Sequence, residues 1–297
     1  MGSESMAALP PAARAPIAAA AASVVVLWAS SFVAVQLALE DLAPGPLALA
    51  RYAVASLVFL ALLPVRRCAL PPPGDLLRMA AAGGTGIALY NFALNSGQRT
   101  VGAGVASLLI NTVPIWTTVL SVLLLKERIR PLAWAGGLVS LSGVTLIALE
   151  RGGSSGLQSG ALMILAAALA QALFFVIQKP LLSRYHPIDL TAYAIWFGSI
   201  FLLPFGGGLF DSLRASSNST LLAVLFLGVG PAALAYLAWS YVLSKVPAGR
   251  ASNLLFLVPV ATITLGWIVL SELPSRTAFG GGALALFGVL LTRRASQ

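Results

Sequence analysis

The chain has 297 residues, of which 59% are hydrophobic and 9% are charged, and its formal net charge at pH 7 is +9. So few polar side chains cannot cover the surface of a soluble globule of this length, which excludes a soluble protein. The basic residues are scattered through short polar segments and form no patch with aromatic residues between them, which argues against a nucleic-acid partner. We therefore expect an all-α integral membrane protein surrounded by the lipid bilayer.

Ten apolar segments follow one another along the chain. At 1.5 Å per residue, each is long enough to cross about 30 Å of hydrocarbon as an α-helix. The segments lie at residues 17–39, 44–65, 74–97, 100–125, 131–149, 157–179, 187–208, 218–243, 248–270 and 276–292. We predict ten transmembrane helices joined by short loops.

The chain is an internal duplication. A shift of 145 residues aligns it with itself, without a gap, from about Leu76 to Leu146. The aligned pairs include Pro114 with Pro259, Glu127 with Glu272, Gly136 with Gly281, and Gly143 with Gly288. The predicted division is a disordered N-terminal tail at 1–16, a first repeat at 17–149, a second repeat at 150–292 and a C-terminal tail at 293–297.

Each repeat contains five of the predicted spans, and an odd number forces the second repeat to enter the membrane inverted relative to the first. The loop charges agree with this topology. With both termini in the cytoplasm, 13 basic residues fall on the cytoplasmic side and four on the opposite side, which follows the positive-inside bias. We predict two inverted five-helix repeats with both termini cytoplasmic.

The sequence offers little for catalysis. It has no Walker-type phosphate loop, one histidine (His186) beside a proline, and one cysteine (Cys68) in a predicted loop. The acidic residues lie in the N-terminal tail, at span ends or in loops, so no carboxylate is predicted near the middle of the membrane. We therefore expect no catalytic residues, no metal site and no cofactor.

Uncharged polar and aromatic residues do lie at depth, and they are the candidates for a substrate site. In the third span Asn91 and Asn95 lie four residues apart on one helix face, and the shift pairs them with Tyr236 and Ser240 of the eighth span. Each amide in hydrocarbon needs a partner or water, so this stripe can face a cavity or form hydrogen bonds between helices. The predicted substrate-binding residues are Trp28, Tyr90, Asn91, Asn95, Asn111, Gln171, Phe175, Tyr236, Trp239 and Ser240.

Arg51 is the charged residue predicted within a span. A guanidinium in the outer third of the second span can snorkel to the membrane surface, which we favour, or attract an anionic group such as a substrate carboxylate.

Glycine and proline residues mark candidate hinges at equivalent depth in the two repeats. Such residues weaken a helix, although glycines also allow helices to pack closely. The candidate hinge or gating residues are Gly83, Gly86, Pro114, Gly228, Pro231 and Pro259. If they bend, one half can rock against the other and expose the polar stripe to either side in turn.

The spacing of a proline, an acidic residue and a glycine occurs once in each half, as Pro114, Glu127 and Gly136, and as Pro259, Glu272 and Gly281. This pattern resembles the paired EamA repeats of the drug/metabolite transporter superfamily. One departure is that Lys126 and Ser271 stand where the family often has glycine.

The resemblance implies ten helices, a central cavity built by spans one to four and six to nine, and peripheral fifth and tenth spans. It also implies a multi-pass protein of the bacterial inner membrane that exports amino acids and related metabolites. Within this superfamily, the branch that we would name for the chain is that of the aromatic amino acid exporters.

The expected function is export of small neutral or zwitterionic metabolites, amino acids including aromatic ones, by alternating access and without a required coupling ion. The alternatives are a proton-coupled transporter of drugs or other metabolites with the same fold, and an intramembrane enzyme, which the lack of a catalytic constellation disfavours. The oligomeric state stays open, with a monomer among the options.

Overall fold

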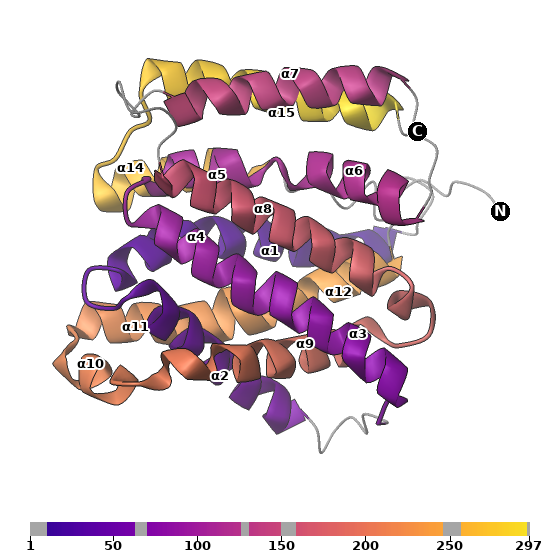
Figure 1. Cartoon of the computed structure of the whole chain (residues 1–297). Helices are drawn as coiled ribbons and strands as arrows, with labels where there is room; N and C mark the ends of the chain where they lie inside the picture. Colours follow the sequence, from indigo (N-terminus) through magenta and orange to yellow (C-terminus); the bar gives the residue numbers. More distant parts are fainter. Residues whose placement is uncertain (1–10, 63–69, 126–130, 150–158, 246–256, 296–297) are drawn as a thin grey trace.

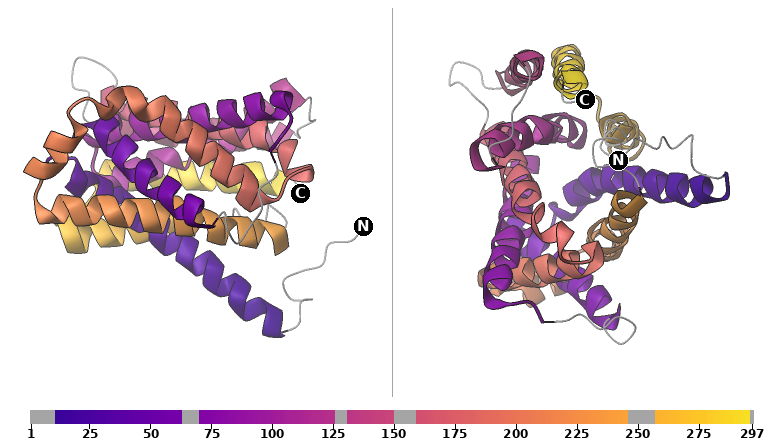
Figure 2. Two further views of the ribbon diagram at one scale, coloured as in Figure 1. Left: turned by 90° about the horizontal axis from the view of Figure 1, so that it is seen from below. Right: turned by 90° about the vertical axis from the view of Figure 1, so that its right-hand side faces the viewer.

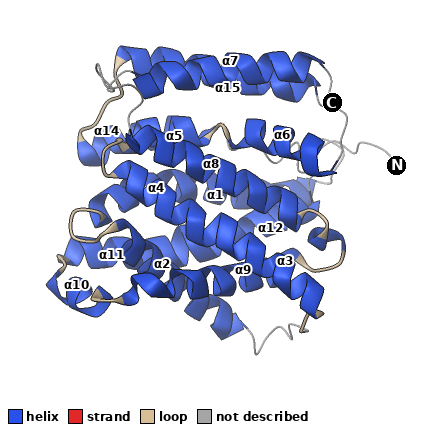
Figure 3. Ribbon diagram, viewed as in Figure 1, coloured by secondary structure: helices blue, strands red, loops and turns tan. Residues whose placement is uncertain are grey.

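The computed structural model describes residues 11–62, 70–125, 131–149, 159–245 and 257–295, and these contain helices and loops but no strands (Figure 3). Two of the elements, η2 and η6, are π-helical turns, and η4 and η5 are short 3-10 turns. In chain order the elements are α1 (Pro11–Ala38), α2 (Pro44–Leu62), α3 (Pro73–Gly83), η2 (Gly84–Leu89), α4 (Tyr90–Gln98), α5 (Ala103–Ile110), α6 (Val113–Leu125), α7 (Pro131–Leu149), α8 (Ser159–Gln178), η4 (Leu181–Ser183), α9 (Pro187–Leu202), η5 (Leu203–Gly206), α10 (Leu209–Ala215), α11 (Asn218–Leu227), η6 (Gly228–Leu234), α12 (Ala235–Lys245), α14 (Leu257–Leu270) and α15 (Arg276–Ala295).

Six helical segments in the described part are long and apolar enough to cross a membrane. They are Ala15–Ala38, Pro44–Leu62, Ala103–Leu124, Ser159–Ser183, Ile188–Gly206 and Asn218–Trp239. The start of the chain differs from the expected tail at 1–16, because α1 already begins at Pro11. The predicted ninth span begins at residue 248, of which the part up to 256 lies outside the described residues.

The third and eighth predicted spans each contain a π-helical turn at the same place in the repeat. In η2 the Tyr90 amide donates to the Thr85 carbonyl, and in η6 the Ala235 amide donates to the Gly230 carbonyl, five residues back in both cases. Glycines in both turns and Pro231 in η6 are poor helix formers, which explains why the helix widens there.

The fourth predicted span is broken and not merely bent. Helix α5 ends at Ile110 and α6 begins at Val113. Pro114 lacks an amide hydrogen for the Ile110 carbonyl four residues earlier, so α5 does not continue through it, whereas a proline is well tolerated in the first turn of the new helix α6. The Asn111 and Thr112 side chains then bond back to the Ser107 and Leu109 carbonyls.

Two groups of helices form the main cores. One core joins α1, α4, α5 and α8 with parts of α14 and α15, and the other joins α2, η2, α9, η6 and α12. Many of the fully buried positions are alanines, among them Ala29, Ala103 and Ala167. Small residues let helix backbones approach in a membrane, where lipid removes most of the hydrophobic drive for association.

Helices α7 and α15 lie against each other at the edge of the molecule (Figures 1 and 2). Their crossing is built on glycines that the 145-residue shift makes equivalent. A methyl group on Gly143 would overlap the backbone of Gly281 and Ala285, and one on Gly288 would overlap the backbone of Gly136 and Ser140. The pair therefore packs backbone against backbone.

Asp41 fastens the α1–α2 turn to the start of α11. Its Oδ2 accepts hydrogen bonds from the Ser217 amide at 2.9 Å, the Ser217 hydroxyl at 2.7 Å and the Thr220 hydroxyl at 2.7 Å. The bonds from Ser217 and Thr220 hold the pKa of Asp41 below its ordinary value of 3.8.

Gly143→Ala and Gly288→Ala are each expected to lower the free energy of unfolding by about 1–3 kcal/mol, because the added methyl meets fixed backbone. Gly280→Ala in α15 is the matched control, since nothing lies within 4 Å of the position of its added methyl. Unfolding of the detergent-solubilised protein measures the effect. Equal stability of all three variants would contradict the packing described.

Asp41→Asn is expected to lower the melting temperature at neutral pH and to have less effect in acid. Because the folded-state pKa is depressed, the carboxylate stabilises the folded protein above about pH 4 and loses this contribution as the pH falls through its folded pKa. Melting curves of wild type and variant between about pH 3 and pH 7 measure the difference. Asp211→Asn, an exposed acid of α10, controls for the loss of charge, and a pH-independent difference for Asp41→Asn would refute the assignment.

Candidate functional site

A buried polar group on α2 and α4 forms the centre of the candidate site. The Arg51 Nη1 donates to Asn91 Oδ1 at 3.0 Å, and the Asn91 Nδ2 donates to the Tyr52 hydroxyl at 3.0 Å. Arg51 is 5% exposed and Asn91 is fully buried. The expectation that Arg51 snorkels to the membrane surface is therefore wrong, because its guanidinium turns inward to an amide on the neighbouring helix.

An aromatic group from α1 and α12 continues this polar group. The Trp28 ring lies 5.7 Å from that of Tyr236, edge to face, and 5.6 Å from that of Trp239. Tyr236 also packs in the same buried core as Tyr52, and Tyr90 lies near Arg51. We call the residues Trp28, Arg51, Tyr52, Tyr90, Asn91, Tyr236 and Trp239 the central cluster.

The two π-helical turns position the central cluster. In η6 the Ala235 amide bonds to Gly230, so the Pro231 carbonyl loses its usual helical partner and accepts the Trp28 indole N–H at 3.3 Å. In η2 the Ile87 carbonyl accepts the Asn91 Nδ2 at 2.8 Å. An unpaired carbonyl is costly in hydrocarbon, so the Pro231 carbonyl needs such a donor. The Ile87 carbonyl also accepts the Tyr90 amide, and there the added bond ties the Asn91 side chain to the turn.

Helix α4 carries a polar stripe that extends beyond Asn91. Asn95 donates from Nδ2 to the Pro44 carbonyl at 3.1 Å, and Gln98 donates from Nε2 to the Phe32 carbonyl at 2.8 Å. Within the described residues, the Asn95 Oδ1 and Gln98 Oε1 are buried without a partner. The amide nitrogens thus bridge helices, while the oxygens still have the capacity to accept a hydrogen bond.

The other predicted binding residues lie apart from the central cluster in their described contacts. Asn111 bonds within its own segment, to the Ser107 carbonyl. Gln171 on α8 has a buried Oε1 without a described partner, and the Phe175 ring contacts that of Phe174. The side chain of Ser240 is outside the described part of the structure.

Sequence reasoning left Tyr52 and Gln98 out of the site. Gln98 could have been found, because it lies seven residues after Asn91 and continues the same helix face. Tyr52 gave no such signal, because its place in the site comes from a hydrogen bond with Asn91 and from packing in the same core as Tyr236, on two distant segments.

The predicted hinge glycines sit at close helix contacts. A methyl on Gly83 would meet backbone atoms of α9, one on Gly86 would meet the Phe174 ring, and one on Gly228 would meet Val54 and the Arg51 carbonyl. Gly86, Gly228 and Pro231 are also part of the π-helical turns, and Gly83 directly precedes one. Of the prolines, Pro114 follows the break between α5 and α6, and Pro259 lies in the first turn of α14.

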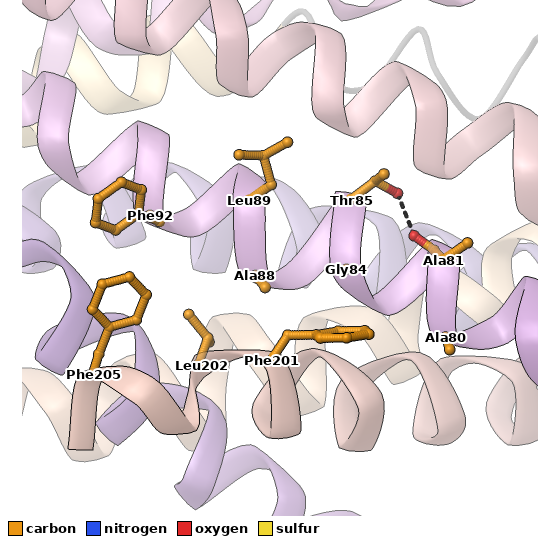
Figure 4. Close-up of a pocket in the computed structure, with 10 residues that line it drawn as sticks. All are labelled: Ala80, Ala81, Gly84, Thr85, Ala88, Leu89, Phe92, Phe201, Leu202 and Phe205. Carbon is orange, nitrogen blue, oxygen red and sulfur yellow. Dashed lines mark hydrogen bonds between the residues drawn. The ribbon is translucent and has the colours of Figure 1, made fainter.

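The structure also has an apolar groove of about 490 Å³ between α3–η2–α4 and α9–η5 (Figure 4). Phe92 and Phe205 stack at one end with ring centroids 5.0 Å apart, and Leu89 and Phe201 are each half exposed. None of the predicted substrate-binding residues lines it. An apolar groove on the outer face of the helices suits lipid acyl chains better than an amino acid.

Long apolar helices around a buried polar and aromatic cluster define the class of this protein as a membrane transporter. In the residues described, no three His, Cys, Asp or Glu side chains gather where a metal ion could bind. The model of the EamA-like transporter family matches residues 15–149 and again residues 158–294. The chain belongs to this family.

Similar proteins carry transporter names. The chain is 36% identical to the uncharacterized transporter YdfC of Bacillus subtilis, over 90% of this chain and 87% of that protein. It is 35% identical to a probable terminal-alkyne amino-acid exporter of Streptantibioticus cattleyicolor, over 91% of both proteins. It is 28% identical to the uncharacterized inner membrane transporter YedA of Escherichia coli K12, over 93% of this chain and 90% of that protein. A solved crystal structure with 21% identity shares the fold, with a TM-score of 0.63 over 95% of this chain and 99% of the other.

Asn91→Leu is expected to destabilise the protein more than Asn95→Leu. The first change removes the acceptor of a buried cation and should cost about 2–3 kcal/mol, whereas the second removes one neutral hydrogen bond and should cost about 1 kcal/mol. Arg51→Met combined with Asn91→Leu should recover part of the loss, because no buried charge then lacks an acceptor. Melting temperatures in detergent measure this order, and the reverse order would contradict the described network.

Proposed function

We propose that this protein exports small neutral or zwitterionic metabolites, amino acids with aromatic members among them, through a central site. The observation that carries the proposal is the central cluster, in which polar and aromatic side chains from α1, α2, α4 and α12 meet at depth. Flat amphipathic rings suit the stacking of an apolar side chain, and the polar groups suit a zwitterionic backbone. The similarity to a probable amino-acid exporter supports this substrate class.

The proposed architecture is ten transmembrane helices in two inverted five-helix repeats, with residues 17–149 and 150–292 as the repeats. The double match of the family model supports it, as do the π-helical turns at equivalent positions in both halves. The packing of α7 on α15 through equivalent glycines gives further support, because it suits a pseudo-two-fold axis between the repeats.

We place the protein in the bacterial inner membrane with both termini in the cytoplasm. The distribution of basic residues supports this orientation. The start of α1 and the end of α15 also lie at the same end of the molecule, as an even number of spans requires (Figure 1).

Transport would proceed by alternating access, with η2 and η6 as the bending points. A π-helical turn can change its hydrogen-bond pattern at low cost, and such turns are frequent at functional sites. These bending points contain or adjoin four of the candidate hinge residues, Gly83, Gly86, Gly228 and Pro231. In the fourth and ninth spans the candidate hinge residues are Pro114 and Pro259. When the central cluster opens, four further residues would complete the substrate path, namely Asn111, Gln171, Phe175 and Ser240.

Counterflow of radiolabelled phenylalanine in proteoliposomes tests this function. Wild-type protein should show saturable exchange, and Trp28→Leu should raise the half-saturating concentration roughly 3- to 10-fold, because ring stacking is lost. Trp267→Leu, at a position of α14 that is 58% exposed, is the matched control and should transport as wild type does.

Absence of saturable exchange for aromatic and aliphatic amino acids would overturn the proposed substrate class. An equal loss in Trp28→Leu and Trp267→Leu, with both proteins folded, would contradict the central site.

Glu272 favours a second candidate, a proton-coupled transporter with the same fold. It is half-buried, and its Oε1 accepts a hydrogen bond at 2.8 Å from the Gln36 Nε2, while the Gln36 Oε1 accepts from the Ala103 amide at 2.8 Å. The carboxylate thus joins the ends of α1, α5 and α14, where protonation would loosen the contact. Exchange that needs an imposed pH gradient, and loses this need in Glu272→Gln, would support this candidate.

A further inference from the structure

Arg51 is a buried cation with unused hydrogen-bond donors. A guanidinium has five N–H donors. In the described structure one bond is made, from Nη1 to the Asn91 Oδ1, and Nε is buried without a partner. Arg51 is 95% buried, so water does not readily supply the missing acceptors.

No described carboxylate balances this charge. Asp75 forms ion pairs with Arg78 and Arg184, away from Arg51. Within the described residues, Arg51 forms no ion pair with the other acidic side chains, which are those of Glu40, Asp41, Asp189, Asp211 and Glu272. A charge in a low-dielectric interior without a counter-charge is costly, and the site therefore favours an anionic ligand.

The surroundings of Arg51 fit a carboxylate. The planar guanidinium can donate two parallel hydrogen bonds to the two oxygens of such a group. The Tyr52 ring centroid lies 5.3 Å from the Arg51 guanidinium carbon, and Tyr236 packs in the same core, so each supplies a hydroxyl that can donate to an anion. A phosphate dianion would need more positive charge than this cluster holds.

The cluster continues from Arg51 to an apolar end. Asn91 links Arg51 to Tyr52, Tyr52 packs in the same buried core as Tyr236, and the Tyr236 ring contacts Trp28. A molecule with a carboxylate at one end and an apolar or aromatic group at the other matches this order of chemistry.

We propose that Arg51 is the substrate-binding residue that holds a carboxylate, and that Trp28, Tyr236 and Trp239 hold the apolar group of the same substrate. This inference rests on the proposed transport function and narrows it to substrates that bear a carboxylate. The alternative is that Arg51 only joins α2 to α4 through Asn91. A purely structural arginine would not discriminate between a carboxylate and its neutral amide.

The test uses two matched pairs of ligands that differ only in the carboxylate. They are phenylalanine with phenylalaninamide, and 3-phenylpropionate with 3-phenylpropionamide, each as a competitor of phenylalanine counterflow in proteoliposomes. For the wild type, the acid of each pair should compete about 10- to 100-fold more strongly than its amide, because charge-assisted hydrogen bonds are lost in the amide. Arg51→Gln should bring this ratio close to one, and Arg51→Lys should retain part of it.

Arg214→Gln is the control variant, because Arg214 lies exposed on α10 and should leave the ratio unchanged. Ligand-induced shifts of the melting temperature in detergent, with the same two pairs, provide a readout that does not depend on transport. If the wild type exchanges no amino acid, the proposed function fails, while a shift with the acids alone still supports Arg51 as a carboxylate site.

Equal competition by acids and amides in a wild type that transports phenylalanine would overturn the Arg51 assignment and leave transport intact. Stronger competition by phenylphosphonate than by 3-phenylpropionate would also overturn it, in favour of a phosphate-like ligand. If Arg51→Gln fails to fold, the ratio in the wild type and in Arg51→Lys decides the question.

Discussion

The backbone carbonyl of Pro231, in the π-helical turn η6, is the constraint on which the centre of this protein depends. A helix that widens in a membrane leaves a carbonyl without its usual partner, and hydrocarbon offers no water to replace it. In η6 the Trp28 indole donates to the Pro231 carbonyl, and in η2 the Asn91 amide donates to the Ile87 carbonyl. The same side chains contact Tyr236 and Arg51, so the turns and the central cluster are one unit.

This connection gives the proposed transport cycle a physical basis. A ligand that engages Arg51 competes for a guanidinium that Asn91 now holds, and a ring that enters the aromatic end meets Trp28. Either event would involve a side chain that is hydrogen-bonded to a π-helical turn, where the helix can change its hydrogen-bond pattern. The apolar groove beside Phe92 and Phe205 is lined by none of the residues of the central cluster, and for this reason we do not propose it as the substrate site.

Much of the helical architecture was accessible from the sequence, because long apolar segments and a positional repeat leave few alternatives. The glycines and Pro231 indicated where the third and eighth spans deviate from a regular helix. Trp28, Tyr236 and Trp239 were predicted only as substrate-binding residues, and the contacts among their rings come from the structure. The inward position of Arg51 could not be predicted, since it depends on an amide 40 residues away on another helix. For the same reason Tyr52 was missed, and the roles of Asn111, Gln171 and Phe175 stay predictions.

The most direct measurement of the central claim is an experimental structure of the protein with bound phenylalanine. The account predicts ligand density within the central cluster, with the carboxylate oxygens within hydrogen-bonding distance of the Arg51 guanidinium and the ring against Trp28 and Tyr236. Density for the ligand in the groove beside Phe92 and Phe205, or along α8 beside Gln171 with Arg51 still bonded to Asn91 alone, would contradict it.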